Sequence, residues 1–263
     1  MTFQAGFIGT GNMGGALATA VYKSDNSLAL YDADIKKAEG LRETLKEATV
    51  CDVKDLASGA RFVFLAVKPN IIRTVAAGIK AYLNPETVIV TMAAGVSLAE
   101  LTETVGCDRV IRIMPNTPAA VGEGMILYCT AAGVTEADEA AFLELMKNAG
   151  VVDKLEEKLF DAAAALSGCG PAYVYMFAQA LADGAVACGV PRDKASVYAA
   201  QTILGSAEML LKSGKHPEKL KDEVCSPGGT TIEGVLALEK AKFRSGAANA
   251  VVAAYQKTAK LKK

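Results

Sequence analysis

The chain of 263 residues contains no tryptophan, only one histidine, and six cysteines that form no C-x-x-C pair. Zinc sites and redox-active pairs are built from clustered cysteines and histidines, so we expect no metal centre and reduced, cytosolic-type thiols. Acidic and basic residues nearly balance, since the formal net charge is -1. Nucleic-acid backbones require a basic surface, so no nucleic-acid partner is expected.

The sequence also lacks an export signal and a convincing membrane segment. An apolar strand begins almost at once, with no basic n-region or cleavage site before it. Residues 162–182 carry no charge over the length that a bilayer helix needs, but they are mainly alanine and are interrupted by Ser-Gly-Cys-Gly-Pro. We interpret this stretch as a buried or subunit-interface helix, and we expect a cytoplasmic protein with no membrane partner.

Up to about residue 153 the chain alternates short apolar runs with amphipathic stretches. The runs predicted as strands are residues 3–9, 27–32, 61–67, 87–93, 109–115 and 124–130. Nearly continuous Val, Ile, Leu and Phe is typical of parallel strands buried on both faces. Helical spacing fills residues 12–23, 34–48 and 70–83. The pattern predicts an α/β fold, with a Rossmann-like doubly wound sheet forming a dinucleotide-binding domain over residues 1–153.

Residues 154–263 have a different pattern, with no convincing strand. Helices are predicted over residues 158–166, 171–190, 193–214, 216–224, 231–243 and 245–263. Many helix faces are rich in alanine, and a helix that is apolar nearly all round must be buried by something. We therefore predict an all-α C-terminal domain that buries its faces against a second subunit.

A glycine motif directly after the first predicted strand carries the main chemical signal. Gly9-x-Gly11-x-x-Gly14 stands between that strand and the helix predicted from Asn12. In such a turn the first glycine permits the bend, the second lets the backbone approach a pyrophosphate, and the third allows close helix packing. The helix N-terminus then offers amide donors and a positive dipole to the anion.

Asp32 ends the second predicted strand, at the position that selects between the two nicotinamide cofactors. A carboxylate there accepts hydrogen bonds from the adenosine ribose hydroxyls and repels a 2′-phosphate, which favours NADH. Lys36 and Lys37 lie close by and could instead meet that phosphate. Asp32 could also cap the helix that starts near Asp34, so both NADH and NADPH stay open.

Three later strands end in small or turn-forming residues, in AVKPN (66–70), MAAGVS (92–97) and IMPNTP (113–118). Parallel strands end at one edge of the sheet, where doubly wound folds bind ligands, so these turns predict a surface that lies along a flat cofactor. Lys68 stands at this edge, and Pro69 suits the first turn of a helix. His216, the only histidine, is better explained as the start of a surface helix than as a catalytic base.

The segment CSPGGTT (225–231) breaks the chain between two helical stretches. Six motifs, this one included, resemble those of the pyrroline-5-carboxylate reductase family over nearly the whole chain. They are GFIGTGNMG (6–14), FLAVKP (64–69), AAGVS (93–97), RIMPNTP (112–118), LSGCGPAYVY (166–175) and LKDEVCSPGGTTIEGV (220–235). The first is shared with other Rossmann dehydrogenases, whereas the last two together are highly specific.

The resemblance implies an enzyme that reduces the C=N bond of 1-pyrroline-5-carboxylate with NADPH or NADH to give L-proline. It implies a substrate site in which backbone amides of the Gly-Gly-Thr turn hold the carboxylate and Thr231, the catalytic residue, meets the ring nitrogen. The substrate-binding residues are then Ser226, Gly228, Gly229, Thr230 and Thr231. The cofactor-binding residues are Ile8, Gly9, Thr10, Gly11, Asn12, Met13, Asp32, Ala66, Val67, Lys68, Pro69, Ala93, Ala94 and Gly95.

The resemblance also implies a homodimer through the helical domain, assembled into a larger homo-oligomer. Two positions depart from the family pattern. Asp32-Ala33 stands where many relatives have a small polar residue with a nearby arginine that suit NADPH, and Cys169 stands where many have serine. The first departure bears on cofactor preference, and the second is interpreted as a tolerated change in a tight helix contact.

Two alternatives remain. A β-hydroxyacid dehydrogenase shares GFIGTGNMG and an all-α second domain, but those enzymes resemble one another in placing a catalytic lysine on a long helix of that domain. The corresponding stretch here, residues 170–184, contains no lysine. The other alternative is a nucleotide-binding protein without turnover, which an assay of NADH consumption would distinguish.

Overall fold

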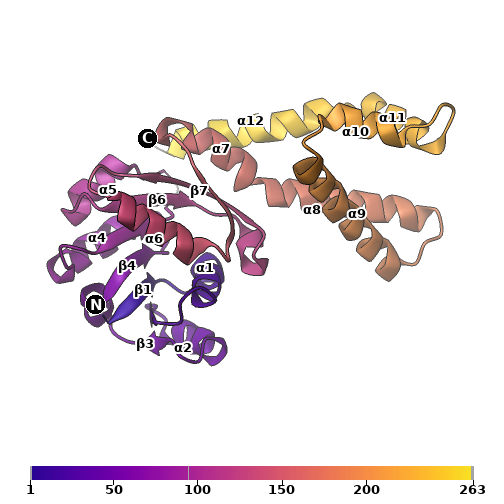
Figure 1. Ribbon diagram of the computed structural model, residues 1–263. Coiled ribbons are helices and arrows are strands. Elements are labelled where there is room, and N and C mark those ends of the chain that lie inside the picture. The colour runs from indigo at the N-terminus through magenta and orange to yellow at the C-terminus, as the bar shows by residue number, and fades with distance from the viewer. Residues whose placement is uncertain (1, 94, 262–263) are drawn as a thin grey trace. The chain divides into compact units, whose positions relative to one another are not determined.

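The computed structural model describes residues 2–93 and 95–261. The chain forms two compact units. Unit 1 contains the described residues up to Gly168 and those from Tyr255 onward, and unit 2 is Cys169–Ala254. The expected fold class is confirmed, because an α/β unit is followed by an all-helical one (Figure 1). The domain division at residue 153 remains a prediction.

Unit 1 is built on an eight-stranded sheet in the order β3-β2-β1-β4-β5-β6-β7-β8 (Figure 1). The strands are β1 Phe3–Ile8, β2 Leu28–Tyr31, β3 Thr49–Val50, β4 Ala60–Leu65, β5 Val88–Thr91, β6 Val110–Met114, β7 Gly124–Thr130 and β8 Gly150–Lys154. The chain leaves β1 toward one edge and returns beside β1 with β4. This reversal is the switch point at which doubly wound sheets bind ligands.

One strand pair departs from the expected parallel arrangement. β6 and β7 are antiparallel, whereas every other neighbouring pair of this sheet is parallel. The connection, residues 115–123, contains only the 3-10 helix η2 Thr117–Val121. A parallel crossover needs about a dozen residues or more, so this short connection turns the chain back.

The helices of unit 1 cover both faces of the sheet (Figure 1). They are α1 Asn12–Tyr22, α2 Ile35–Thr44, α3 Val53–Gly59, α4 Ile72–Ile79, α5 Leu98–Val105, α6 Glu136–Met146 and α7 Phe160–Ser167, with the 3-10 helices η1 Lys80–Tyr82 and η3 Glu157–Leu159. α2 is shorter than the predicted 34–48, since the chain leaves helical geometry at Leu45. Pro69 precedes α4 in a turn closed by Ile71 N–H on Lys68 O (3.1 Å), so its expected place in a helix was wrong.

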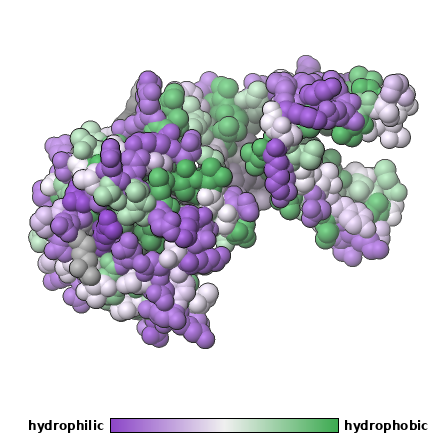
Figure 2. Space-filling model, in the orientation of Figure 1, coloured by the Kyte–Doolittle hydropathy of each residue, from purple (hydrophilic) through white to green (hydrophobic). Residues whose placement is uncertain are grey.

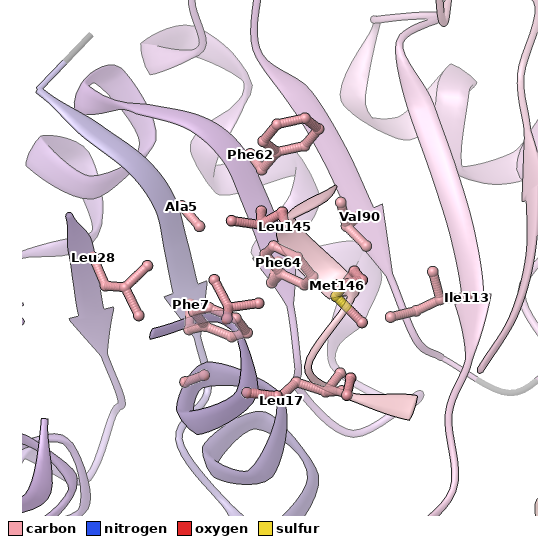
Figure 3. Packing of buried hydrophobic residues seen from close by; sticks show 14 of the residues in the cluster. Ala5, Phe7, Leu17, Leu28, Phe62, Phe64, Val90, Ile113, Leu145 and Met146 are labelled. Atoms are coloured by element: carbon pink, nitrogen blue, oxygen red, sulfur yellow. The ribbon is translucent and has the colours of Figure 1, made fainter. Parts of the chain in front are cut away.

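Alternating side chains of the central strands fill a core on each side of the sheet. Phe7 and Phe64 stack on one face with ring centroids 4.4 Å apart, beside Leu145 (Figure 3). Ile8 and Leu65 point into the other core. Burial on both faces explains why the strands are almost continuously apolar in sequence.

Unit 2 is helical and has little core of its own. Its helices are α8 Gly170–Ala187, α9 Arg192–Ser213, α10 Pro217–Val224, α11 Thr230–Lys240 and the first part of α12 Phe243–Leu261. Its buried apolar cluster consists of Ala182, Ala195 and Ala199. Large apolar side chains instead lie on its surface, where Figure 2 shows apolar groups among polar ones. They include Tyr175, Met176, Val197, Tyr198, Leu204, Met209, Leu211, Leu236 and Val252.

Within the described ranges, no helix is long and apolar enough to cross a membrane. The uncharged stretch 162–182 is divided between α7 and α8, which are separated at Gly168 and Cys169. In the same ranges no group of three or more His, Cys, Asp or Glu is placed to hold a metal ion. All six cysteines are free thiols.

Candidate active site

The turns proposed to hold the cofactor follow four neighbouring parallel strands. In the sheet register Ile8 pairs with both Tyr31 and Leu65, and Leu65 pairs with Thr91, so β1, β2, β4 and β5 end at the same edge. The predicted cofactor residues from Ile8 to Met13, Asp32, Ala66 to Pro69, Ala93 and Gly95 therefore lie along one edge of the sheet. Ala94, also predicted, lies outside the described residues.

Two glycines of the motif, Gly9 in the turn and Gly14 in α1, are required by close backbone packing. Gly9 has φ +101, and a Cβ there would lie 2.5 Å from the carbonyl oxygen of Ala66. A Cβ on Gly14 would lie 2.1 Å from the carbonyl oxygen of Gly9 and 2.9 Å from Ala66 Cβ. The turn, α1 and the end of β4 are thus in mutual contact, which no larger side chain would permit.

Gly11 has a different role, because nothing lies within 4 Å of the position its Cβ would take. It is the N-cap of α1 and has an extended conformation (φ -69, ψ -168) with no side-chain capping bond. The first amides of a helix have no partner inside the helix, so α1 offers them to an external anion. The open space and the unused donors fit the pyrophosphate of a dinucleotide.

A cavity of about 470 Å³ opens beside this helix end. It is lined by Thr10, Gly11, Asn12, Gly15, Ala16, Thr19, Lys37, Leu41 and Ala120. Lys37 was singled out from the sequence as a possible phosphate contact, whereas Thr19, Leu41 and Ala120 were not. These three lie on α1, α2 and η2 and belong to no motif, so only their spatial proximity reveals them.

The Asp32 carboxylate is held at the end of β2 by two backbone amides. Oδ2 accepts from Thr10 N (2.8 Å) and Thr10 Oγ1 (3.3 Å), and Oδ1 accepts from Asp34 N (2.9 Å). Partial burial opposes ionisation, but these hydrogen bonds and the charge of Lys37 outweigh it, so the pKa of Asp32 lies below its usual value. Asp34, and not Asp32, is the N-cap of α2. Asp32 is therefore an oriented anion at the point where an adenosine ribose would lie.

The predicted substrate residues belong to unit 2: Ser226, Gly228 and Gly229 lie between α10 and α11, and Thr230 and Thr231 begin α11. Gly229 N–H donates to Ser226 O (3.0 Å), and Gly228 has φ +64. Pro227 at the second position and a positive-φ glycine at the third are typical of a type II turn. The Gly229 amide is therefore already used within the turn, although the sequence suggested it as a free donor. His216 accepts from Glu218 N (3.3 Å) as the N-cap of α10, which confirms it as the start of a helix.

This turn leads into α11, which, like α1, begins at a glycine N-cap with no side-chain cap. Gly229 is the N-cap of α11, and Thr230 and Thr231 are its first two residues. The amides of Thr230, Thr231 and Ile232 have no partner within the helix, so they and the helix dipole suit a carboxylate. The Thr231 hydroxyl lies one residue inside the helix, next to these donors.

Two family models match separate parts of the chain. One, described as pyrroline-5-carboxylate reductase dimerisation, matches residues 157–261. The other, described as NADP oxidoreductase coenzyme F420-dependent, matches residues 4–95. The first covers the helical unit and the second covers the glycine turn, Asp32 and the turns after β4 and β5.

Whole-chain similarity extends to several curated proteins and solved structures. Pyrroline-5-carboxylate reductase of Arabidopsis thaliana is 40% identical over 265 residues, which is 99% of this chain and 96% of that protein. The protein of that name from Escherichia coli strain K12 is 40% identical over 268 residues, 100% of both chains. The crystal structure of Plasmodium falciparum pyrroline carboxylate reductase with NADP bound has a TM-score of 0.88 at 34% identity, covering 99% of this chain and 98% of that one.

Proposed function

The chain belongs to the pyrroline-5-carboxylate reductase family, and we propose that the turn after β1 holds its dinucleotide while the turn before α11 holds its substrate. It is an NAD(P)-dependent oxidoreductase that acts on a CH–NH bond and reduces 1-pyrroline-5-carboxylate to L-proline. One observation carries the site assignment: α1 and α11 both begin at a glycine N-cap with no side-chain cap. One uncapped helix suits a pyrophosphate and the other a carboxylate.

The bound nicotinamide supplies the hydride that reduces the imine carbon. The protein's own part is orientation, since well-placed reactants gain about 7–11 kcal/mol over free encounter. We assign the substrate carboxylate to the amides of Thr230, Thr231 and Ile232, shifted from the Gly229 amide that the turn already uses. Thr231 Oγ1 then accepts from the ring N–H and holds the ring in one orientation.

The activity is tested by mixing the protein with pyrroline-5-carboxylate and NADH or NADPH and following the nicotinamide absorbance. We expect the absorbance to fall and L-proline to form with at least one of the two cofactors. Flat traces with both would refute the enzyme activity and leave a nucleotide-binding protein.

The role of Thr231 is tested by Thr231→Ala, with Thr202→Ala on α9 as the control. Losing a hydrogen bond to a charged group costs about 1.5–3 kcal/mol, so turnover should fall roughly 10- to 150-fold. Binding of NAD(P)H should stay unchanged, since that site lies in unit 1. Thr231→Ser keeps the hydroxyl and should retain most of the turnover. A Thr231→Ala enzyme with wild-type turnover would remove Thr231 from the mechanism.

For cofactor preference, we propose that Asp32 admits NADH and that Lys37 allows NADPH as well. Asp32 is an oriented carboxylate and Lys37 lines the neighbouring cavity, about half exposed and 3.9 Å from Asp34. A 2′-phosphate about 4 Å from a carboxylate is repelled by roughly 4 kcal/mol at an effective dielectric constant near 20. Binding of NADPH therefore requires Asp32 to turn away or Lys37 to offset it.

The preference is measured as the ratio of kcat/KM for NADH to kcat/KM for NADPH. Asp32→Ser removes the carboxylate that would accept from the ribose and repel a 2′-phosphate, so the ratio should fall at least about 100-fold. Asp34→Asn removes the 3.9 Å ion-pair partner of Lys37 and should lower the ratio far less. Lys37→Gln should lower NADPH use more than NADH use. An unchanged ratio in Asp32→Ser would contradict the assignment.

The helical unit matches a dimerisation family, and its exposed apolar helix faces support a homodimer through it. Assembly of dimers into a larger homo-oligomer is part of the proposal, and analytical ultracentrifugation tests it directly. A cytoplasmic location likewise remains proposed from the sequence alone.

A further inference from the structure

The proposed substrate turn lies at the tip of a helical hairpin. α10 ends at Val224 and α11 begins at Thr230, and the residues between them turn the chain back (Figure 1). Neither helix has a buried residue. Apolar packing within the described chain therefore does little to hold the two helices at one spacing.

An arginine at the opposite end of the hairpin connects the two helices. Arg244, near the start of α12, donates from Nη1 to Glu218 Oε1 (2.6 Å) and from Nε to Glu239 Oε1. Glu218 lies in the first turn of α10 and Glu239 in the last turn of α11. One guanidinium thus joins the two helix ends that lie farthest from the turn. Lys221 donates to the other oxygen of Glu218 (2.6 Å).

The chain between α11 and α12 is shaped to bring Arg244 back to this position. Lys242 has φ 58, the only positive φ outside glycine in the described chain, and its N–H donates to Glu239 O (2.9 Å). The left-handed region is sterically unfavourable for a residue with a Cβ. Such strain persists only where surrounding contacts fix it, and Arg244 supplies such contacts two residues later.

The ionic contacts remain in place over the working range of an enzyme. Hydrogen bonds from Arg244 and then Lys221 lower the pKa of Glu218 to about 2. Solvent screens exposed ion pairs, so the contribution of this group to folding is small. Its effect is geometric, since the planar guanidinium donates in two fixed directions.

We propose that Arg244 is a positioning residue for substrate binding: it joins Glu218 to Glu239, fixes the spacing of α10 and α11, and so holds the turn 226–231 in its anion-binding form. The inference rests on the proposed role of this turn as the carboxylate site. Amide donors bind an oxyanion well only when they converge on it, and a displacement of about 1 Å can cost 100-fold.

The test compares Arg244→Gln with Lys212→Gln, which removes the exposed Lys212–Glu208 ion pair on α9. In Arg244→Gln we expect the KM for pyrroline-5-carboxylate to rise about two- to fivefold, the range that the loss of exposed ion pairs allows. The KM for NAD(P)H, the melting temperature and the oligomeric state should stay at the wild-type values, as all of them should in Lys212→Gln. Arg244→Lys keeps the charge but cannot donate to both carboxylates in one plane. Its KM for pyrroline-5-carboxylate should therefore lie between the values of the wild type and of Arg244→Gln.

A wild-type KM for pyrroline-5-carboxylate in Arg244→Gln would overturn the proposal. Equal losses in substrate binding, nucleotide binding and assembly would overturn it as well, because they would show general damage. Thr231→Ala in the same series separates the two levels of the argument. If Thr231→Ala impairs turnover and Arg244→Gln changes nothing, the positioning role fails alone; if neither has an effect, the site assignment fails.

Discussion

Gly11 and Gly14 lie three residues apart at the start of α1, and replacing each with alanine should have a different effect. Gly14→Ala places a Cβ 2.1 Å from Gly9 O and 2.9 Å from Ala66 Cβ, where no side chain can move aside. Gly11→Ala places a Cβ in open space, in a conformation that alanine adopts freely. We expect Gly14→Ala to impair folding and Gly11→Ala to impair only cofactor binding.

The magnitudes follow from these distances. Carbon atoms in contact prefer about 3.5–4.0 Å, so α1 must move away from the turn after β1 in Gly14→Ala. Overpacking of this kind costs about 1–3 kcal/mol and exceeds the roughly 0.5–1 kcal/mol that Gly→Ala contributes within a helix. In Gly11→Ala the methyl group would crowd a pyrophosphate bound at the proposed site. Losing one hydrogen bond to a charged group, about 1.5–3 kcal/mol, weakens NADH binding roughly 10- to 150-fold.

Gly78→Ala is the matched control, since Gly78 lies in α4 and has nothing within 4 Å of its Cβ position. It should raise stability by about 0.5–1 kcal/mol and leave cofactor binding unchanged. Urea unfolding gives the stabilities, and quenching or enhancement of NADH fluorescence gives the dissociation constants. Gly11→Ala with wild-type NADH affinity would refute the assignment of α1 as the pyrophosphate site, and Gly14→Ala with raised stability would refute the packing argument.

Two further predictions concern buried ion pairs of unit 1. Asp138 is 2% exposed and accepts from Arg109 and from Thr135; burial raises the pKa of its carboxyl, but those bonds outweigh it and the pKa is lowered. Its contribution to stability is therefore present above pH ~4 and is lost progressively as the pH falls below that. In urea unfolding, Asp138→Asn should cost about 3 kcal/mol at pH 7, and the cost should shrink as the pH falls below about 4. Glu157→Ala removes the 2.9 Å partner of Arg112, which is also 2% exposed, but leaves Asp161 at 3.6 Å from its guanidinium. The free energy of unfolding should fall by about 1–3 kcal/mol, and an unchanged value would show that Asp161 alone compensates Arg112.

The parts of unit 1 that the sequence predicts are those with a strong local signal. The strands with continuous apolar runs were found because both faces are buried, as at Phe7 and Ile8. β3 has two residues, and β8 exposes Val151 at 63%, so neither has an apolar run to detect. The antiparallel pairing of β6 and β7 was missed because the amino-acid composition of an apolar run indicates burial but not the direction of the strand.

The candidate site was predictable where a backbone requirement selects a residue type. Close backbone contacts require glycine at positions 9 and 14, and a positive φ favours glycine at position 228. All three residues are therefore recognisable in the sequence. The contacts of Lys37 and Arg244 depend on how separate helices pack, and a charged residue on a helix face gives no signal of its partner. The assignments of individual residues to cofactor and substrate remain predictions that the variants above test.

The small core of unit 2 has a consequence for how the enzyme behaves on dilution. Three buried alanines contribute too little apolar burial to offset the conformational entropy of α8 to α11 and the first part of α12, so we expect most of the folding free energy of this unit to come from a partner chain. Its melting temperature should then depend on protein concentration, and below the dimer dissociation constant the helical hairpin would lose its support. Activity per mole of chain would fall below the same concentration. The amount of chain present would then determine what fraction of the molecules has a formed substrate site.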